Sequence, residues 1–147
     1  MIKYSCGFLF RHNRVLLVRK THPEWQSGLL NGIGGRINDN ETPVDGMRRE
    51  FLEETTLPIE DWDHFATEIG RDYMCYFFRA RQEFPKGVVP QHNDKREKLE
   101  WFDADVQPFR RGIVGNLQWL VPMALDPRSM RATIDVQKSD ISARPTW

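Results

Sequence analysis

The sequence is poor in the features that mark membrane proteins, disulfide-rich proteins and zinc sites. Its 147 residues contain two cysteines, and no apolar run reaches the 18 residues that a membrane span requires. Cys6 and Cys75 fall in stretches expected to form strands, so we expect buried thiols rather than a disulfide or a metal pair. With no signal-peptide pattern either, we expect one cytoplasmic domain over residues 1–147, long enough for a real core.

An excess of charge of one sign is also missing. Lys plus Arg and Asp plus Glu balance at 21 each, so no overall basic field would attract nucleic acid non-specifically. The four histidines show no zinc-ligand spacing, and we interpret them as surface or structural residues. They are His12, His22, His64 and His92. The balanced charge therefore gives no strong signal for nucleic-acid binding.

What the chain does have is a dense acidic pattern. Glu50, Glu53 and Glu54 stand at i, i+3 and i+4, so in a helix they share one face about one turn long. Like charges at this spacing destabilise a helix unless positive charge is supplied from outside. Mg²⁺ and Mn²⁺ take oxygen ligands, usually carboxylates together with substrate phosphates, so this face is a candidate metal site. A solvated acidic face is the alternative interpretation.

Local signals predict the helix itself. Thr42 is a good N-cap, Pro43 suits the first helical position, and Asp45 complements the positive end of the helix. Leu57-Pro58 ends the element, because Pro cannot continue a helix. An apolar stripe would bury the opposite side of the helix, and it consists of Val44, Met47 and Phe51.

Glycines precede this helix in the segment Asn31-Gly32-Ile33-Gly34-Gly35. Glycine lets a backbone approach a ligand closely, so the carbonyl oxygen of Gly34 is a candidate to complete an oxygen site with the glutamates. Glycines in loops usually mark turns, and the cluster by itself is therefore weak support for a site.

Together these segments resemble the Nudix box, G-x5-E-x7-R-E-U-x-E-E-x-G-U, in which U is a bulky apolar residue. The matching residues, in order, are Gly35, Glu41, Arg49, Glu50, Phe51, Glu53, Glu54 and Leu57. The last fixed Gly of the signature is Thr56 here. That Gly would leave the helix in a left-handed conformation, which a β-branched residue adopts poorly, so we expect a locally different helix exit.

The resemblance implies an α/β fold, an α/β/α sandwich around a central mixed β-sheet, and the rest of the pattern is compatible with it. Tyr73–Phe78 is apolar on both faces, as in a strand covered by helices on both sides. A second helix is expected over Leu117–Leu125, short or kinked at Pro122. Further strands are expected at Ile2–Phe10, Val15–Val18 and Lys98–Phe102, and a last one at Ile134 and Val136.

The resemblance also implies the chemistry. Metal ions would neutralise a diphosphate, orient it and lower the pKa of a bound water. Glu50 and Glu54 would be the principal ligands, Glu53 a ligand or the base, and Arg49 an orienting residue paired with the glutamates or with Glu41. A carboxylate from outside the box often joins them. Asp94, Glu97 and Glu100 are the candidates, of which we choose Glu97, with a surface charge as the alternative interpretation.

For the substrate, Asn31–Arg36 resembles the Asn-Gly-Phe-Gly-Gly-Lys stretch of enzymes that sanitise oxidised purine nucleoside triphosphates. In that subgroup the Asn reads the base edge, so Asn31 is a candidate base contact, with Gly35 beside the substrate. Trp119, like Trp25, is a candidate to stack a base. Where the subgroup carries paired acids before the late Trp, this chain has Gly115-Asn116.

Three functions follow. The first is an Mg²⁺-dependent hydrolase that converts a nucleoside triphosphate to the monophosphate and pyrophosphate, with Mn²⁺ as a substitute ion. The second is a Nudix pyrophosphatase for a nucleotide sugar, ADP-ribose or a capped RNA end, and the third is a nucleotide-binding domain without catalysis. The polar stretch 139–147 is expected to be a disordered tail. Its Trp147 is a candidate contact to a second copy, which leaves a homodimer open.

Overall fold

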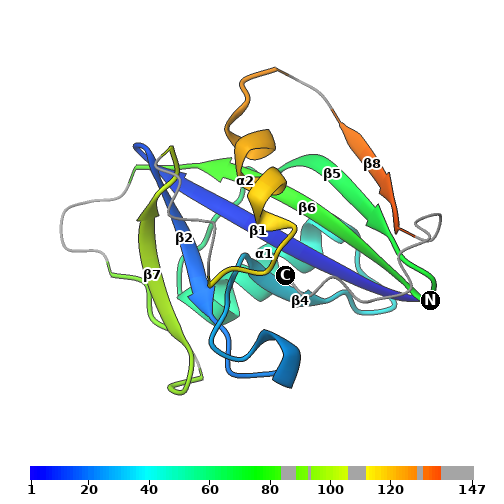
Figure 1. The fold of residues 1–147 in the computed structure, drawn as a ribbon, viewed down its shortest axis with the longest axis horizontal. Helices are drawn as coiled ribbons and strands as arrows, with labels where there is room; N and C mark the ends of the chain where they lie inside the picture. The colour runs from blue at the N-terminus through cyan, green and yellow to red at the C-terminus, as the bar shows by residue number, and fades with distance from the viewer. Residues whose placement is uncertain (84–88, 93, 106–111, 129–130, 137–147) are drawn as a thin grey trace.

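The computed structural model describes residues 1–83, 89–92, 94–105, 112–128 and 131–136. These residues form one mixed sheet with a helix on each face (Figure 1). In chain order the elements are β1 (Ile2–Arg11), β2 (Arg14–Arg19), the 3₁₀ turn η1 (Glu24–Gln26), β3 (Leu30–Asn31), β4 (Ile33–Arg36), α1 (Pro43–Thr55), β5 (Asp63–Ile69), β6 (Tyr73–Arg81), β7 (Lys98–Asp103), α2 (Leu117–Leu125) and β8 (Ala132–Asp135).

Strand β1 organises the sheet. It pairs in parallel with β6 along nearly its whole length, from Ile2 opposite Tyr73 to Phe10 opposite Arg81. Its other edge is shared, since β4 pairs with the first half of β1 and β2 with the second half, both antiparallel. Strand β7 lies on the far edge of β2, while β5 and then β8 extend the sheet beyond β6. The predicted central mixed sheet is confirmed.

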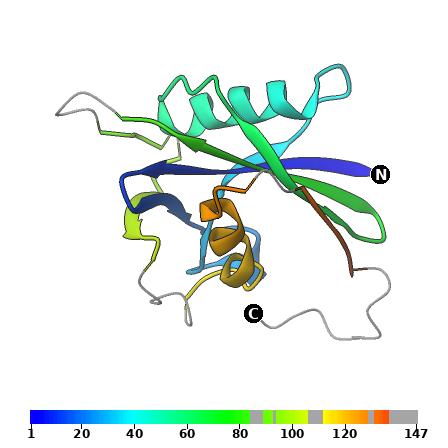
Figure 2. The same cartoon turned by 90° about the horizontal axis from the view of Figure 1, so that it is seen from above.

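The two helices cover opposite faces of this sheet, α1 above and α2 below in Figure 2. Alternate strand residues therefore belong to two separate apolar clusters. Phe8 and Phe77 lie in the cluster beneath α2, whereas Leu9 and Phe78 lie in the cluster beneath α1. The α/β/α sandwich is thus confirmed. The predicted cover on both sides of the Tyr73–Phe78 run is present at Phe77 and Phe78, whereas the first four residues of the run are only partly buried.

Helix α1 begins as predicted. Thr42 lies in extended conformation and its Oγ1 accepts a hydrogen bond from the Asp45 N–H at 3.2 Å, which satisfies one of the free amides of the first turn. Met47 and Phe51 are fully buried, and Val44 packs against the same cluster. The apolar stripe therefore holds the helix on the sheet and leaves the acidic face on another side.

The prediction that the chain would leave α1 in a conformation other than left-handed is wrong. Thr56 itself adopts the left-handed conformation, with φ 65° and ψ 7°, and its N–H donates to the carbonyl of Leu52. Tertiary packing overrides the local preference here, because the chain must turn sharply to bury Leu57 and Ile59 in the α1 cluster. The buried Thr55 Oγ1 accepts the Leu57 N–H at 3.1 Å and fixes this turn.

The C-terminal elements are short. Helix α2 is nine residues long and contains Pro122, which has no N–H to donate to the carbonyl four residues earlier. Ile134 lies in β8 as expected, but the strand ends at Asp135, one residue before Val136. The expected tail, with Trp147, lies outside the described residues. None of the helices in the described ranges is long and apolar enough to cross a membrane.

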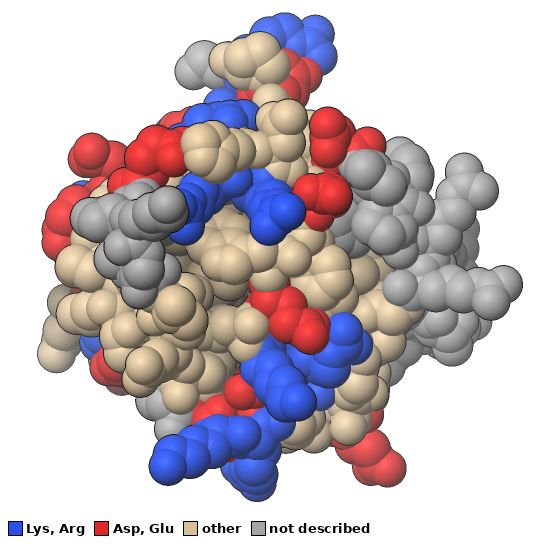
Figure 3. All heavy atoms as spheres, turned by 90° about the vertical axis from the view of Figure 1, so that its left-hand side faces the viewer, with Lys and Arg blue, Asp and Glu red and all other residues tan. Residues whose placement is uncertain are grey.

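Acidic and basic side chains mix on the surface. On the face shown in Figure 3, red and blue groups lie beside one another rather than in fields of one sign. This arrangement agrees with the balanced composition of 21 basic and 21 acidic residues. Cys6 is buried and Cys75 is partly buried, both as free thiols, and burial raises the pKa of Cys6 to about 12.

Candidate active site

The acidic face of α1 lies directly against the glycines of β4. A Cβ added to Gly35 would lie 2.6 Å from the Glu50 carboxyl carbon, and one added to Gly34 would lie 1.9 Å from the carbonyl oxygen of Ser5. Real Cβ atoms do not approach this closely, so a larger residue at position 35 would displace the Glu50 carboxylate, and one at position 34 would push β1 away. The glycines predicted from the sequence therefore bring the strand backbone and the Glu50 carboxylate into contact.

Arg49 holds three carboxylates in place. Its guanidinium donates to both oxygens of Glu41, at 3.1 and 2.6 Å, to Glu50 at 2.8 Å and to Glu53 at 3.3 Å. A further N–H reaches the carbonyl of Arg36 at 3.0 Å. The hydrogen bonds from Arg49 lower the pKa of Glu41, and those to the glutamates raise the pKa of Arg49. The predicted pairing with Glu41 is present, and the hydrogen bonds that Arg49 donates go to protein acceptors.

Glu54 lies apart from this cluster. Its side chain is 16% exposed, and among the described residues its buried Oε2 has no hydrogen-bond partner. Burial raises the pKa of Glu54 to about 8, and the charges of Glu50, Glu97 and Glu53 add to this while Lys20 opposes it. A buried carboxylate among other carboxylates is the type of group that a cation would stabilise.

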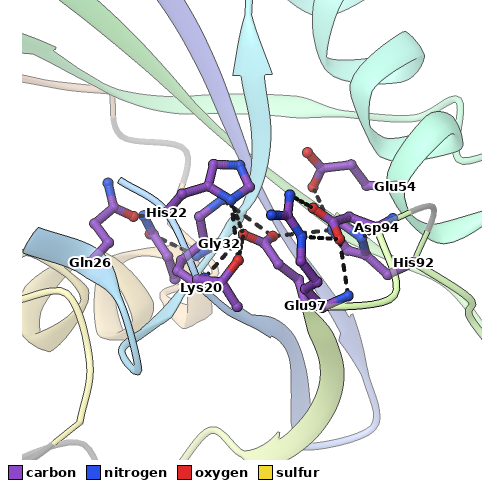
Figure 4. A network of polar contacts seen from close by, with 11 residues as sticks. Lys20, His22, Gln26, Gly32, Glu54, His92, Asp94 and Glu97 are labelled. Atoms are coloured by element: carbon purple, nitrogen blue, oxygen red, sulfur yellow. Dashed lines mark hydrogen bonds and ion pairs between the residues drawn. The ribbon is translucent and has the colours of Figure 1, made fainter. Parts of the chain in front are cut away.

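Glu97, our choice among the carboxylates outside the box, is 4% exposed, so the interpretation as a surface charge is wrong. Contacts from two segments converge on it (Figure 4). Its carboxylate lies 3.4 Å from Lys20 Nζ and 3.3 Å from His22 Nδ1, and it accepts the Thr21 N–H at 3.2 Å. The carboxylates of the other two candidates are held by arginines, because Asp94 pairs with Arg96 and Glu100 with Arg19.

His92 joins Glu97 to Glu54. The Asp94 N–H donates to His92 Nδ1 at 2.9 Å, so the ring proton must lie on Nε2. This Nε2 is 3.4 Å from Glu97 and 3.7 Å from Glu54, and the side chain is 6% exposed. Burial lowers the pKa of His92 although Glu97 opposes the shift, which favours the neutral ring. We interpreted His92 as a surface or structural residue, and its place in this cluster had no local signal in the sequence.

The carboxylates suit a hard divalent cation, although they are not gathered into a chelate. Within the described ranges, no three Asp, Glu, His or Cys side chains are arranged to hold a metal ion. The reason is visible in the contacts, since Arg49 holds Glu50 and Glu53 while Glu54 faces His92. The fit rests instead on the unpartnered Glu54 Oε2 and on the oxygen donors of α1 around it.

A cavity of about 440 Å³ adjoins this acidic face. Gly34, Gly35 and Lys20 line one part of it, Asn31 lines it too, and Trp25 stands at its rim with 52% exposure. Its remaining walls and floor come from β1, β5, β6 and the start of α2, and the residues include Cys6, Glu68, Tyr73, Phe77 and Asn116. The volume lies in the range of small-molecule sites.

Two predicted substrate contacts have different outcomes in this cavity. Asn31 lines it, but its amide is already engaged: Nδ2 donates to Gln26 Oε1 at 3.0 Å, and Oδ1 accepts the Gly32 N–H at 2.8 Å. Trp119 is not among the described residues that line the cavity, and it packs against the apolar cluster beneath α2. The phase of the helix turns Trp119 toward the core, so the structure does not bring it to the site.

Comparison with known proteins gives the chain its family. Residues 4–116 match the model of the NUDIX domain. The oxidized purine nucleoside triphosphate hydrolase of Mus musculus is 26% identical over 141 residues, which cover 93% of this chain and 88% of the mouse protein. The enzyme of the same name from Danio rerio is 26% identical over 132 residues, 87% of this chain and 82% of its own.

Solved structures show the same fold. A MutT protein from Bacillus halodurans superposes with a TM-score of 0.73 at 18% identity, covering 94% of this chain and 92% of its own. The NUDIX domain of Shewanella oneidensis NrtR, solved with ADP ribose, has a TM-score of 0.67 at 19% identity, with 84% and 86% covered. With the family match and the glutamate helix together, the chain belongs to the Nudix family and is a hydrolase acting on phosphoric anhydride bonds.

Proposed function

We propose that the protein is a divalent-metal-dependent nucleoside triphosphate diphosphohydrolase acting on modified purine nucleotides. Water would attack between the α- and β-phosphates, so that one nucleoside triphosphate and one water give the monophosphate and pyrophosphate. The observation that carries the proposal is the buried Glu54 carboxylate on the acidic face of α1, whose Oε2 has no hydrogen-bond partner among the described residues, next to a cavity of about 440 Å³. The relatives named as oxidized purine nucleoside triphosphate hydrolases, aligned along most of the chain, support the choice of substrate.

The residues fit Mg²⁺, or Mn²⁺ as its substitute. Glu50, Glu53, Glu54 and Glu97 would hold the ion with the Gly34 carbonyl, and the ion would neutralise phosphate charge and lower the pKa of a bound water. Glu53, with 51% of its side chain exposed, is a ligand or the base for that water.

Other residues position these groups. Arg49 is bonded to Glu41, Glu50 and Glu53 at once, so it sets the direction of two proposed ligands. His92 stands between Glu54 and Glu97, with its Nε2 3.7 Å from the first and 3.4 Å from the second carboxylate. Asn31 and Gly35 line the cavity and would contact the substrate there.

Product analysis tests the proposal. The protein is incubated with Mg²⁺ and a panel of normal and oxidised nucleoside triphosphates, with ADP-ribose in parallel, and the products are separated. We expect a nucleoside monophosphate with pyrophosphate, and loss of turnover in Glu54→Gln but not in Glu60→Gln, whose carboxylate is 76% exposed. Cleavage of ADP-ribose alone, or normal turnover by Glu54→Gln at saturating Mg²⁺, would contradict it.

A further inference from the structure

A second buried carboxylate lies in the same cavity, away from the box. Glu68, on β5, is 8% exposed and lines the cavity wall. Among the described residues, no Lys, Arg or His lies within ion-pair distance of it. Its two hydrogen-bond partners are neutral: the Tyr73 hydroxyl donates to Oε1 at 2.7 Å, and Asn116 Nδ2 donates to Oε2 at 3.4 Å. Burying a carboxylate is costly unless its lone pairs are used, and a carboxylate accepts about four hydrogen bonds.

Asn116 adds another acceptor at the same place. Because its Nδ2 faces Glu68, its amide is oriented with Oδ1 on the other side. That Oδ1 is buried and has no hydrogen-bond partner in the part of the chain that the structure describes. Glu68 from β5 and Asn116 from the start of α2 therefore present spare acceptors together on one wall of the cavity.

The amide of Asn31 has less capacity to accept hydrogen bonds from a ligand. Each end of it is used within the protein, by Gln26 and by Gly32. A ligand that reaches the cavity meets apolar or sulfur surface at Cys6 and Phe77. Ser5 Oγ, on β1, is also buried without a hydrogen-bond partner among the described residues, but Glu68 and Asn116 are the two lining side chains that face each other with acceptor capacity left for a ligand.

We propose that Glu68 and Asn116 bind a purine edge carrying two adjacent N–H donors, a ring N–H beside an exocyclic amino group, as in guanine. Adenine is disfavoured, because its ring nitrogen on that edge is itself an acceptor and would face a carboxylate or a carbonyl oxygen. Oxidation of a guanine at C8 leaves this edge unchanged, so both forms fit. Tyr73 is a positioning residue that holds Glu68. The proposal rests on the proposed function for the nature of the ligand as a nucleotide.

Binding of the products to the unaltered protein is the first test. Titration calorimetry with dGMP, dIMP and dAMP, without divalent metal, compares three bases that differ on this edge; dIMP lacks only the amino group. We expect dGMP to bind best, with dIMP roughly 10-fold or more weaker and dAMP weaker still, because each missing donor leaves a buried acceptor unpaired. Equal affinities for dGMP and dAMP, or no binding of dGMP, would overturn the proposal.

A variant series supplies the second test. Glu68→Gln replaces one acceptor by a donor, and we expect it to reduce kcat/KM for dGTP roughly 10- to 100-fold while leaving or raising that for dATP. Glu24→Gln makes the same chemical change on an exposed residue of η1 beside the rim, and both substrates should be unaffected. Equal losses for dGTP and dATP in Glu68→Gln would refute base recognition by Glu68.

The two proposals fail differently. If dGMP binds selectively but no nucleoside triphosphate is hydrolysed, the proposed function is wrong and the recognition of the donor edge stands. If triphosphates are hydrolysed but bases are not distinguished at Glu68, the recognition is wrong and the proposed function stands. Should Glu68→Gln fail to fold, the comparison of dGMP, dIMP and dAMP on the unaltered chain still decides the question.

Discussion

Replacing Glu54 by Gln should stabilise the protein at high pH when no divalent metal is present. Gln has the shape of the protonated acid but cannot ionise. In the native structure burial raises the pKa of Glu54 to about 8 from the model-peptide value of 4.5, so the native state prefers the neutral side chain. The neutral variant therefore escapes a cost that the unaltered protein meets as its carboxyl group ionises.

The sign and size follow from the pKa difference. A carboxyl group whose folded pKa is raised contributes its stability fully below pH 4.5, and that contribution is lost as the pH rises through about 8. Each pKa unit corresponds to ~1.4 kcal/mol, so the whole shift amounts to on the order of 5 kcal/mol at pH 9. For a chain of this size that is roughly 10 °C in Tm. Below pH 4.5 the two proteins should melt alike.

Thermal unfolding in EDTA between pH 4 and pH 9 measures this directly, with Glu60→Gln as the control because its carboxylate is exposed. Adding Mg²⁺ at pH 8 should raise the Tm of the unaltered protein and change that of Glu54→Gln much less, since a cation replaces the missing positive partner. Melting temperatures of the two proteins that run parallel across the whole pH range would refute the reasoning about a buried Glu54 that is costly to ionise.

Two other substitutions test the end and the middle of the same helix. Thr56→Gly should stabilise the protein by about 1 kcal/mol in urea unfolding, because Thr56 sits at φ 65° and glycine adopts this conformation without strain; an unchanged or lower midpoint would contradict it. Arg49→Lys keeps the charge but cannot bond Glu41, Glu50 and Glu53 together, so the Mg²⁺ concentration for half-maximal rate should rise roughly tenfold or more. An unchanged Mg²⁺ requirement would make Arg49 a purely structural ion pair.

The helix was predictable because everything that defines it is local. A cap at Thr42, a Pro at the first position and an apolar stripe fix where α1 begins and which side is buried. The placement of Glu50, Glu53 and Glu54 on one face then follows from helix geometry alone. The direction of their carboxylates does not follow, since it depends on Arg49 and on a histidine from a distant loop.

One expectation failed, and one candidate residue lies away from the cavity, because tertiary packing outweighs residue preference. Thr56 adopts a left-handed conformation that its side chain disfavours, because Leu57 must return to the core within one residue. Trp119 was a candidate to stack on a base as an aromatic near the end of the chain. Helix α2 turns it toward the sheet instead, and its phase cannot be read from the Trp itself.

The parts of the site that sequence reasoning did not find are contacts between remote segments. Lys20 and Glu97 are 77 residues apart, and Glu68 and Asn116 are 48 residues apart. Strand pairing brings them together: β2 with β7 places Lys20 near Glu97, and β5 in the sheet places Glu68 near the start of α2. Such pairs have no signature in spacing along the chain, because a register has to be known first.

Glu68 shows how a contact between remote segments bears on base specificity. Before the late Trp, where the chain resembles enzymes with paired acids, Gly115 offers no side chain and Asn116 offers an amide. Read along the sequence, this departure removes the acid that would accept hydrogen bonds from a base. Glu68 lies in a different segment of the sequence, but in the structure its carboxylate accepts a hydrogen bond from Asn116 Nδ2 at 3.4 Å. An acceptor pair can therefore be retained while its acid moves to another strand, because a base edge responds to the position of oxygen atoms and not to the segment that carries them.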